Sequence, residues 1–412
     1  MLIVVVDTLR ADRLRAYDPD ASMPSPAFDR LAGGGQLFEL AYAHASWTKP
    51  SVATLLTGVL PGRHGATTHE RALDESVPLL AECMSAAGYE TGAFVANGYI
   101  GERFGFERGF DEFRNAAQTG RGRGDELVED LLRWIDARDS GAPFFGYLHT
   151  TDVHAPYLPR AETLAALDAA PYRGPIDFDG APNLLQRIER GEVPLTGRDR
   201  TRLEALYDAG AYDHDELVLG PLVEGLHDRG LLRNTLVVFT SDHGEELFDH
   251  GSVGHGGTRV WEELIHVPLV IHWPGLAPAR IAGSVGLVSI AATITDATGV
   301  RPMTGLDGVS LVPVLEAGRG STGPVLGATG GLSFAVHGHY KLVRSRGQAD
   351  AWMDLVRDPW EHASAPNVGR KDVARLTTAL TLATRVSSPR RTPPPIIDAD
   401  TLERLRALGY VH

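Results

Sequence analysis

The sequence of 412 residues is short of cysteine, of basic residues and of long apolar runs. Its single cysteine, Cys83, excludes an internal disulfide, which is compatible with the cytosol and uninformative about export. Lysine and arginine number 39 against 53 acidic residues, and the net charge of −14 argues against nucleic acid or an anionic membrane as the main partner. An anionic substrate remains possible, because local cations set the field inside a cleft.

No signal peptide or membrane span is visible in the sequence. The longest apolar runs include LIVVV and HVPLVIHW, far short of the roughly 20 residues that cross a bilayer. Met1 stands almost inside the first expected strand. We therefore expect a cytoplasmic protein as the chain is given, or an exported one if an upstream leader is missing from it.

Strand-like and helix-like segments alternate over most of the chain. With a hydrophobic content of 43%, this alternation predicts an α/β protein with a doubly wound, mostly parallel sheet flanked by helices. Short alternating patterns after about residue 302 predict a small C-terminal antiparallel β subdomain that carries a helix. The expected units are a large domain, 1–301, with 158–200 as an insertion or lid; a small α+β subdomain, 302–388; and a Pro-rich linker with a docking tail helix, 389–412.

Acidic residues follow two of the expected strands. Asp7 follows a β-branched run, LIVVV, and Asp242 with His243 follows another, LVVFTS. The carboxyl ends of strands in an open parallel sheet form the crevice where ligands bind, so both carboxylates can point to one position. An aspartate after a strand is often only a turn or helix-cap residue. Two of them with a neutral imidazole, however, suit a divalent cation.

Thr48, in SWTKPSVATLLTG, offers a hydroxyl for nucleophilic attack. We expect it at the N-cap of an apolar helix, with Pro50 in the first turn and Gly58 as the stop. The free backbone N–H groups of a helix N-terminus favour an anion. Together with the residues at the strand ends, Thr48 indicates a metal-activated nucleophile for a phosphorus or sulfur ester.

The order of these motifs resembles that of the sulfatase branch of the alkaline phosphatase superfamily. The resemblance runs through VVDTLRAD, SWTKPSVATLLTGVLPGRHG, GFERGFDEF, LHTTDVHAPY, VVFTSDHGEE, GHGGTRVWEELIHVPLVIHWPG, TGLDGVSLVPVL and ERLRALGYVH. It implies an alkaline phosphatase-like fold and ester hydrolysis. It also implies roles for single residues: Asp7, Thr48, Asp242 and His243 as metal ligands, Thr48 as the nucleophile, and His154 and His255 as contacts to the transferred group or the leaving oxygen.

The two histidines also stand in local settings that favour function. His154 precedes Ala155 and Pro156, and proline forces its neighbour into an extended backbone, so the imidazole is expected on a stiff loop. His255 lies between glycines, and a glycine backbone can approach a ligand closely.

Three departures from the sulfatase pattern bear on the chemistry. Sulfatases oxidise a Cys or Ser to formylglycine within a Cys-x-Pro-x-Arg signature, whereas this frame reads Thr48-Lys49-Pro50-Ser51-Val52. Threonine cannot become that aldehyde and Cys83 has no such frame, so no formylglycine is expected. Val52 replaces the signature arginine, and Lys49 either replaces its charge or points to solvent. Thr8 stands where the family usually has a second acidic residue.

These departures favour phosphate over sulfate. A sulfated formylglycine hydrate expels sulfate by collapsing to the aldehyde, and a sulfated threonine lacks that exit. A phosphorylated threonine is released by in-line attack of water or an alcohol. The sequence therefore predicts a metal-dependent hydrolase of phosphate or sulfate esters that favours phosphoesters. The alternatives are a phosphoglycerol- or phosphoethanolamine-type transferase and a non-catalytic metal-binding relative.

The ligand types leave several points open. One divalent ion is expected; Mn, Zn, Mg or Ca would fit, and the imidazole mildly disfavours the last two. Asp152 would be the ligand of a second ion, although a single ion is favoured. His64, His149 and His250 fit supporting or structural roles as well as functional ones. The substrate is expected to be a small-molecule, glycan or lipid ester.

Overall fold

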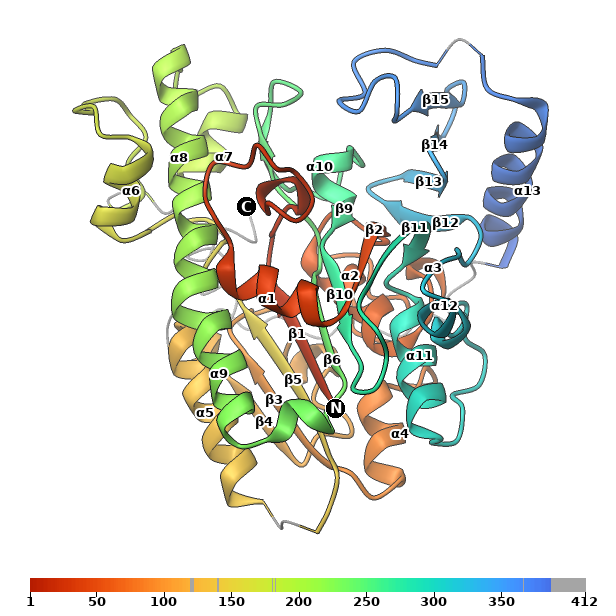
Figure 1. The fold of residues 1–412 in the computed structure, drawn as a ribbon. Coiled ribbons are helices and arrows are strands. Elements are labelled where there is room, and N and C mark those ends of the chain that lie inside the picture. Colours follow the sequence, from red (N-terminus) through yellow and green to blue (C-terminus); the bar gives the residue numbers. More distant parts are fainter. Residues whose placement is uncertain (119–121, 139–140, 180, 182, 366, 387–412) are drawn as a thin grey trace.

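The computed structural model describes residues 1–118, 122–138, 141–179, 181, 183–365 and 367–386 (Figure 1). Its centre is a nine-stranded sheet in the order β11-β2-β10-β6-β1-β5-β3-β4, with β9 paired to β2. β10 runs antiparallel to its neighbours and most other pairs are parallel, as the sequence predicts. The strands are β1 (Leu2–Val6), β2 (Gln36–Tyr42), β3 (Glu90–Val95), β4 (Glu112–Asn115), β5 (Phe144–Thr150), β6 (Val237–Ser241), β9 (His266–Val267), β10 (Leu269–His272) and β11 (Ala279–Gly286).

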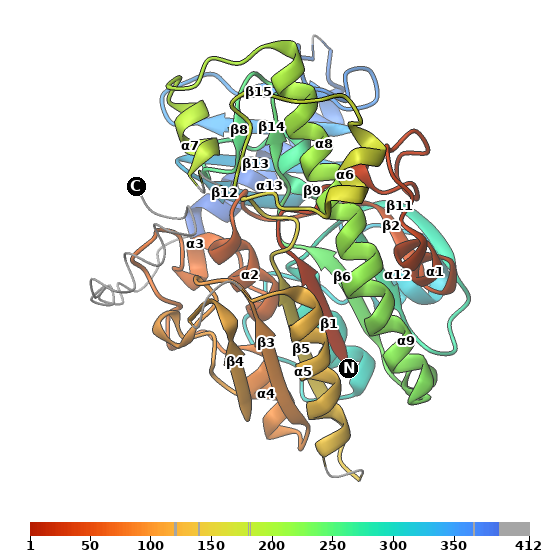
Figure 2. The same ribbon diagram turned by 90° about the vertical axis from the view of Figure 1, so that its left-hand side faces the viewer.

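β1 lies in the middle of the sheet because its five residues are all apolar and can be buried on both faces. Ile3 and Val5 pack into the core on one face, and Leu2, Val4 and Val6 pack into the core on the other. Helices cover both faces, which confirms the doubly wound arrangement (Figures 1 and 2). On the face of Val5 lie α2 (Thr48–Thr57), α4 (Leu80–Ala86), α11 (Ser289–Thr298) and α12 (Val312–Ala317); on the face of Val4 lie α1 (Pro26–Gly34), α5 (Gly124–Ala137), α8 (Gly197–His214) and α9 (Gly220–Asp228).

The long helix predicted before β6 contains a π-helical turn. α8 and α9 are joined through Asp215–Leu219, which forms hydrogen bonds of the wider π type. The buried Asp215 carboxylate accepts hydrogen bonds from the N–H groups of Ala27 and Phe28 at 2.9 and 2.8 Å. The turn therefore places a carboxylate at the N-terminus of α1, where the helix dipole favours an anion.

The predicted insertion, 158–200, contains two short helices and the start of α8. Its helices are α6 (Ala161–Leu167) and α7 (Leu184–Glu189). α7 lies against the short strand Val253–Gly254 (Figure 2). A movement of this segment as a lid stays a prediction. The other short elements are α3 (Pro61–His64), α10 (Glu262–Ile265), the two-stranded pair β7 (Glu246–Leu247) and β8 (Val253–Gly254), and 3-10 turns at Ala11–Arg13, Glu102–Phe104, Ala116–Gln118 and Leu231–Arg233.

A separate antiparallel sheet follows the large one, as the sequence predicts. Its order is β12-β13-β14-β15, and one face packs on α13 through Ala335, Leu342, Leu376 and Leu380. The domain boundary at residue 302 stays a prediction. Leu311, which lies beyond this boundary, packs into the core of the large sheet. The predicted linker and tail helix, 389–412, lie outside the described residues. The elements are β12 (Val325–Thr329), β13 (Leu332–His337), β14 (Tyr340–Ser345), β15 (Ala351–Asp354) and α13 (Arg370–Val386).

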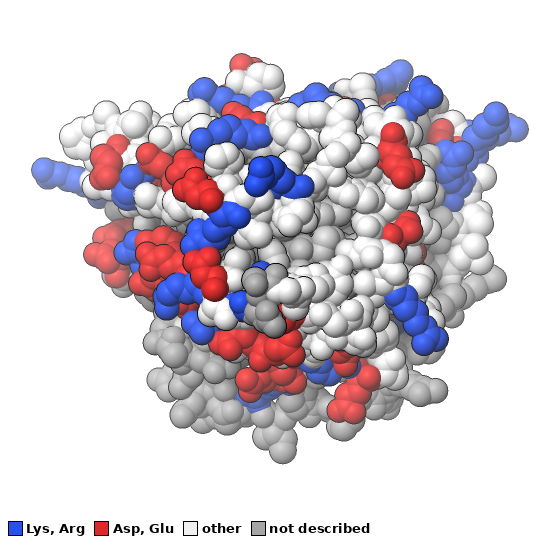
Figure 3. All heavy atoms as spheres, turned by 60° about the horizontal axis from the view of Figure 1, so that its bottom comes forward, with Lys and Arg blue, Asp and Glu red and all other residues white. Residues whose placement is uncertain are grey.

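Acidic side chains lie beside basic ones over much of the face shown in Figure 3. Within the part of the chain that the structure describes, none of the helices has the length and apolar character needed to cross a membrane.

Candidate active site

The candidate site lies at the carboxyl ends of three neighbouring strands. β1 pairs with β6 on one side and with β5 on the other, and Val6 is in register with Ser241 and Thr150. Asp7, which follows β1, therefore lies beside Asp242, which follows β6. Both carboxylates are fully buried. The strand order thus brings together two acidic residues that are far apart in the sequence.

His243 lies among the other predicted ligands. Its Nε2 is 3.4 Å from Thr48 Oγ1, 3.6 Å from Asp7 Oδ1 and 3.5 Å from Asp242 Oδ2. Its Nδ1–H donates to the carbonyl oxygen of Gly244 at 2.8 Å, because a carbonyl can only accept. This hydrogen bond leaves the lone pair of Nε2 directed at the other three side chains. The structure therefore brings all four side chains to one position.

Two buried carboxylate oxygens lack hydrogen-bond partners at this position. Asp7 Oδ1 and Asp242 Oδ2 make no hydrogen bond to any residue that the structure describes. Burial, followed by the charge of Asp7, raises the pKa of Asp242 well above its usual value. Burial also acts to raise the pKa of Asp7, but the nearby imidazoles, led by His154, hold it below its usual value. Buried negative charge without partners calls for a cation.

The separations between these groups also fit a bound cation. Ligands held about 2.1 Å from a tetrahedral ion lie about 3.4 Å from each other. The distances from His243 Nε2 to Thr48, Asp7 and Asp242 are 3.4, 3.6 and 3.5 Å. The donor set of two carboxylates, one imidazole and one hydroxyl is therefore able to hold a divalent metal.

Two further side chains reach the same carboxylates. His149, on β5, places its Nε2 3.4 Å from Asp7 Oδ2, and with Asp7 and Asp242 it forms a set of ligand atoms within 4.8 Å of one another. Asn97, just after β3, donates from Nδ2 to Asp7 Oδ2 at 2.6 Å and to Thr48 Oγ1 at 3.5 Å. Sequence reasoning left His149 open and missed Asn97. The signal that could have found both is the one used for Asp7: a polar residue at the carboxyl end of an apolar strand.

Thr48 begins α2, and its prediction as the N-cap residue is wrong by one position. Trp47 is the N-cap and Thr48 is the first helical residue, because Thr48 already has helical backbone hydrogen bonding. All ten residues of α2 are buried. The helix ends at Gly58 in a left-handed conformation with φ 66°, as predicted. Ser51 Oγ donates to the carbonyl oxygen of Asp242 at 2.5 Å, so the first turn is attached to the loop that follows β6.

Thr8 has a left-handed backbone with φ 63°, which a β-branched residue rarely adopts. Three contacts hold it: its N–H donates to Asp242 Oδ1 at 3.3 Å, its Oγ1 donates to the Asp7 carbonyl at 2.7 Å, and its carbonyl accepts from Tyr207 Oη at 2.6 Å. Strain of this kind persists where the surroundings fix it, often at functional sites. Thr8 therefore orients a carboxylate instead of supplying one.

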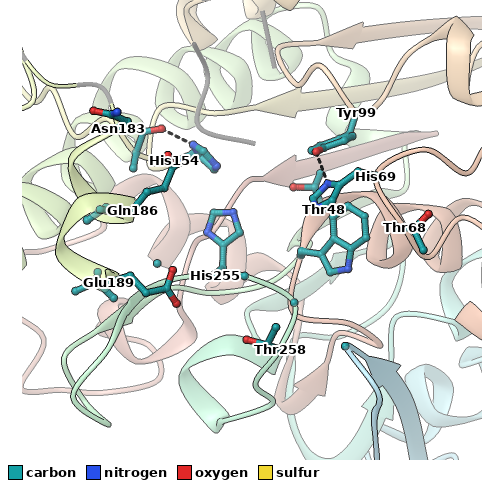
Figure 4. Close-up of a pocket in the computed structure, with 18 of the residues that line it drawn as sticks. Thr48, Thr68, His69, Tyr99, His154, Asn183, Gln186, Glu189, His255 and Thr258 are labelled. Atoms are coloured by element: carbon teal, nitrogen blue, oxygen red, sulfur yellow. Dashed lines mark hydrogen bonds between the residues drawn. The ribbon is translucent and has the colours of Figure 1, made fainter. Parts of the chain in front are cut away.

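A cavity of about 330 Å³ opens beside Thr48 (Figure 4). In this view Thr48, His69 and Tyr99 lie on one side and His154 on the other, with His255 between them. Residues of the predicted insertion also line the cavity: Asn183, Leu185, Gln186 and Glu189. The insertion therefore forms part of the wall next to the candidate nucleophile.

Both predicted histidines reach this cavity. The ring centres of His154 and His255 are 4.9 Å apart, and the His255 ring is 4.4 Å from that of His243. Burial lowers the pKa of His154. Burial acts to lower the pKa of His255 as well, but Glu245, whose Oε1 is 2.8 Å from Nδ1, gives a net rise. His255 is thus the imidazole on this wall that is better able to carry a proton.

Lys49 neither points to solvent nor lies in the cavity wall. Its side chain is buried, and Nζ donates to the carbonyl oxygen of His69 at 2.8 Å. The ammonium lies 3.8 Å from the ring centre of Phe104, which is a cation–π distance. Burial lowers the pKa of Lys49 well below its usual value.

Asp152 and His64 form hydrogen bonds outside the group of predicted metal ligands. Asp152 Oδ1 accepts a hydrogen bond from the N–H of Gly124 at 3.1 Å, at the start of α5. It belongs to neither group of metal-binding side chains found among the described residues. His64 Nε2 lies 3.1 Å from Thr54 Oγ1, and its Nδ1 accepts from the N–H of Ala66 at 3.2 Å, which are contacts that join α2 to α3.

Known proteins are similar to this chain in sequence and in fold. A sequence model of the sulfatase family matches residues 1–300. Arylsulfatase K of Xenopus laevis is 24% identical over 365 residues, which cover 77% of this chain and 66% of that protein. A protein solved in complex with its substrate D-glucosamine-2-N,6-O-disulfate is similar with a TM-score of 0.78 and 20% identity, over 94% of this chain and 97% of the other. The phosphonate monoester hydrolase of Agrobacterium radiobacter is similar with a TM-score of 0.76 and 22% identity, over 94% of this chain and 95% of the other.

The structural likenesses establish the fold, and the family match covers the large sheet with all of the strand ends that build the site. The chain therefore belongs to the sulfatase family, a family of ester hydrolases.

Proposed function

We propose that this protein is a divalent-metal-dependent hydrolase of phosphoesters that uses Thr48 as its nucleophile. The observation that carries the proposal is the position of Thr48 Oγ1, in the cavity wall and 3.4 Å from His243 Nε2. The unpartnered oxygens of Asp7 and Asp242 lie around the same imidazole. A hydroxyl so placed is beside both a cation site and a space for substrate.

Asp7, Thr48, Asp242 and His243 would hold the cation. Bound there, a divalent metal would offset the negative charge of the transferred group and lower the pKa of the attacking hydroxyl. Thr48 gives up its hydroxyl proton, and its Oγ1 forms the bond to phosphorus as the bond from phosphorus to the leaving oxygen breaks. The leaving oxygen takes up a proton, and water then cleaves the phosphothreonine. His255, across the cavity, is placed to contact the leaving oxygen, and His154 to contact the transferred group.

The chemistry of threonine supports phosphate over sulfate as the transferred group. A threonine has no route to formylglycine, so a sulfated Thr48 would have no internal exit, whereas a phosphorylated one is open to in-line attack by water. The fold neighbours include a phosphonate monoester hydrolase and a protein that takes a sulfated sugar, so the same scaffold accepts either group. Small-molecule, glycan and lipid esters all remain within the proposal.

The test is a substrate panel on purified protein loaded in turn with Mn²⁺, Zn²⁺, Mg²⁺ and Ca²⁺. Aryl phosphate diesters, monoesters and phosphonate esters should be cleaved faster than aryl sulfates. Thr48→Ser should keep appreciable activity, and Thr48→Ala should lose about 1,000-fold or more in kcat, which corresponds to about 4 kcal/mol of barrier. Thr68→Ala, which removes another hydroxyl from the same cavity, is the matched control and should keep most of the activity.

Trapping separates this function from its alternatives. Acid quenching during turnover should give phosphothreonine at residue 48, detected by mass spectrometry. Multiple-turnover sulfatase activity that is undiminished in Thr48→Ala would refute both the nucleophile and the preference. Transfer of the group to an added alcohol in place of water would identify a transferase. Tight metal binding without turnover of any ester would identify a non-catalytic relative.

A further inference from the structure

A second cluster of metal-binding side chains lies outside the active site, between the large body and the small sheet. His250 stands in the loop between β7 and β8, Glu263 lies in α10, and Glu361 follows β15. One ligand atom from each of these residues lies within 4.8 Å of the other two. The β7–β8 loop and α10, which are close in the sequence, therefore build the cluster together with a much later segment.

The ligand atoms of this cluster are buried, and those of Glu263 and His250 lack hydrogen bonds. Glu263 and Glu361 are each only 5% exposed. Glu263 Oε1 and His250 Nε2 make no hydrogen bond within the described part of the chain, and Glu361 Oε1 lies 2.7 Å from the Lys341 ammonium. Glu263 Oε1 and His250 Nε2 are nevertheless 3.2 Å apart. That separation is close to the spacing of about 3.4 Å between two ligands of one tetrahedral ion.

The charges around the cluster are not balanced by the protein. Buried Lys341 lies 2.7 Å from Glu361 Oε1, donates to Glu361 Oε2 at 2.9 Å, and also donates to Glu262 Oε1 at 3.1 Å. One ammonium is thus shared by two carboxylates, and His250 is the basic side chain that pairs with Glu263 among the described residues. Burial raises the pKa of Glu263 to about 8, which reflects the cost of a carboxylate charge at this buried position.

The His250 ring has a fixed orientation, and a cavity beside Glu263 gives an ion access to the cluster. The His250 ring stacks on Trp261, with ring centres 4.0 Å apart and 13° between the planes, which fixes the orientation of the imidazole. Glu262 and Glu263 line a cavity of about 530 Å³ between α10 and the segment after β15. A metal site needs such an entry path as well as its ligands.

We propose that His250, Glu263 and Glu361 bind a second divalent cation of the Zn²⁺ class, with a structural role. One imidazole with two carboxylates favours Zn²⁺ over Ca²⁺ or Mg²⁺, which take oxygen ligands. The ion would fasten the β7–β8 pair and α10 to the small sheet.

The proposed site is also close to the loop of the first one. A Cβ on Gly244, next to His243, would lie 1.9 Å from the carbonyl oxygen of Glu263, so α10 packs directly against the loop that follows β6. An ion on Glu263 would therefore stiffen the support of that loop. This inference does not depend on which ester the protein cleaves.

The experiment measures Zn²⁺ stoichiometry in full-length, chelator-stripped protein by calorimetry and elemental analysis. Wild type should bind two equivalents. Asp242→Asn, which removes a ligand of the first site, should keep one equivalent and still be stabilised by Zn²⁺ in thermal unfolding. Adding His250→Gln to Asp242→Asn should weaken the remaining equivalent by more than about 100-fold.

Glu262→Gln is the matched control, because Glu262 contacts Lys341 but is not a proposed ligand. In the Asp242→Asn background it should keep the second equivalent. Glu263→Gln provides an independent variant that leaves His250 in place and should lose the equivalent. An Asp242→Asn protein that binds no Zn²⁺, or one whose second equivalent survives both His250→Gln and Glu263→Gln, would overturn the proposal.

Discussion

Replacing Asp242 by asparagine should stabilise the metal-free protein. The ligand oxygens of Asp7 and Asp242 lie within 4.8 Å of each other. Two ionised carboxylates at that distance repel by about 3 kcal/mol or more at an effective dielectric constant of about 20. Asparagine keeps the volume and the Oδ1 that accepts from the N–H groups of Thr8 and His243 at 3.3 and 2.9 Å. Because protonation relieves part of the repulsion in wild type, we expect a gain of about 1–3 kcal/mol in the free energy of unfolding.

The order of stability should reverse when metal is present. A cation that binds only the folded state stabilises it by about 2.7 kcal/mol at 100 times its Kd, and Asp242→Asn loses this contribution at the first site. The assay is urea unfolding of wild type and Asp242→Asn at neutral pH, once with EDTA and once with Mn²⁺ or Zn²⁺. Both proteins keep the cluster of His250, Glu263 and Glu361. The difference between their stabilisation by metal therefore reports on the first site alone.

Asp213→Asn is the control for loss of a buried carboxylate that has a protein partner. Asp213 accepts hydrogen bonds from Arg160 and from Thr163 Oγ1 at 2.8 and 2.6 Å, so its variant should be destabilised equally with EDTA and with metal. An Asp242→Asn protein that is less stable than wild type in EDTA by more than about 1 kcal/mol would show that hydrogen bonding outweighs repulsion. Equal stabilisation of both proteins by metal would remove Asp242 from the ligand set.

Two other predictions concern support of the site and pH. Asn97→Ala removes the donor to Asp7 Oδ2 at 2.6 Å and should weaken cation binding by about 10–100-fold in calorimetry, and unchanged affinity would deny Asn97 a supporting role. Burial lowers the pKa of His214 from 6.5 to about 3, so wild type loses stability as pH falls from 6.5 towards 3, where only the unfolded chain takes up this proton. His214→Gln should reduce the slope of unfolding free energy against pH by up to about 1.4 kcal/mol per pH unit in urea titrations, and an unchanged slope would contradict the prediction.

The sequence by itself determined the fold class and the residues with local signals. LIVVV is apolar at every position, which is what a strand buried on both faces needs, and Asp7 stands directly after it. Asp242 and His243 follow a second such strand, and Gly58 marks a helix end that favours a left-handed residue. Each of these features depends on the residue and its neighbours in the chain, so it can be recognised without knowing the strand order.

Only the tertiary structure decided which strand ends meet and what surrounds them. His149 and Asn97 reach Asp7 because β5 lies beside β1 and β3 lies beside β5. The same holds for the second cluster, in which His250 meets Glu361 across the junction with the small sheet. Such contacts arise because burying the apolar faces of all elements together selects one packing of the chain. That selection is global, so local patterns mark polar residues at strand ends but do not say which of them meet.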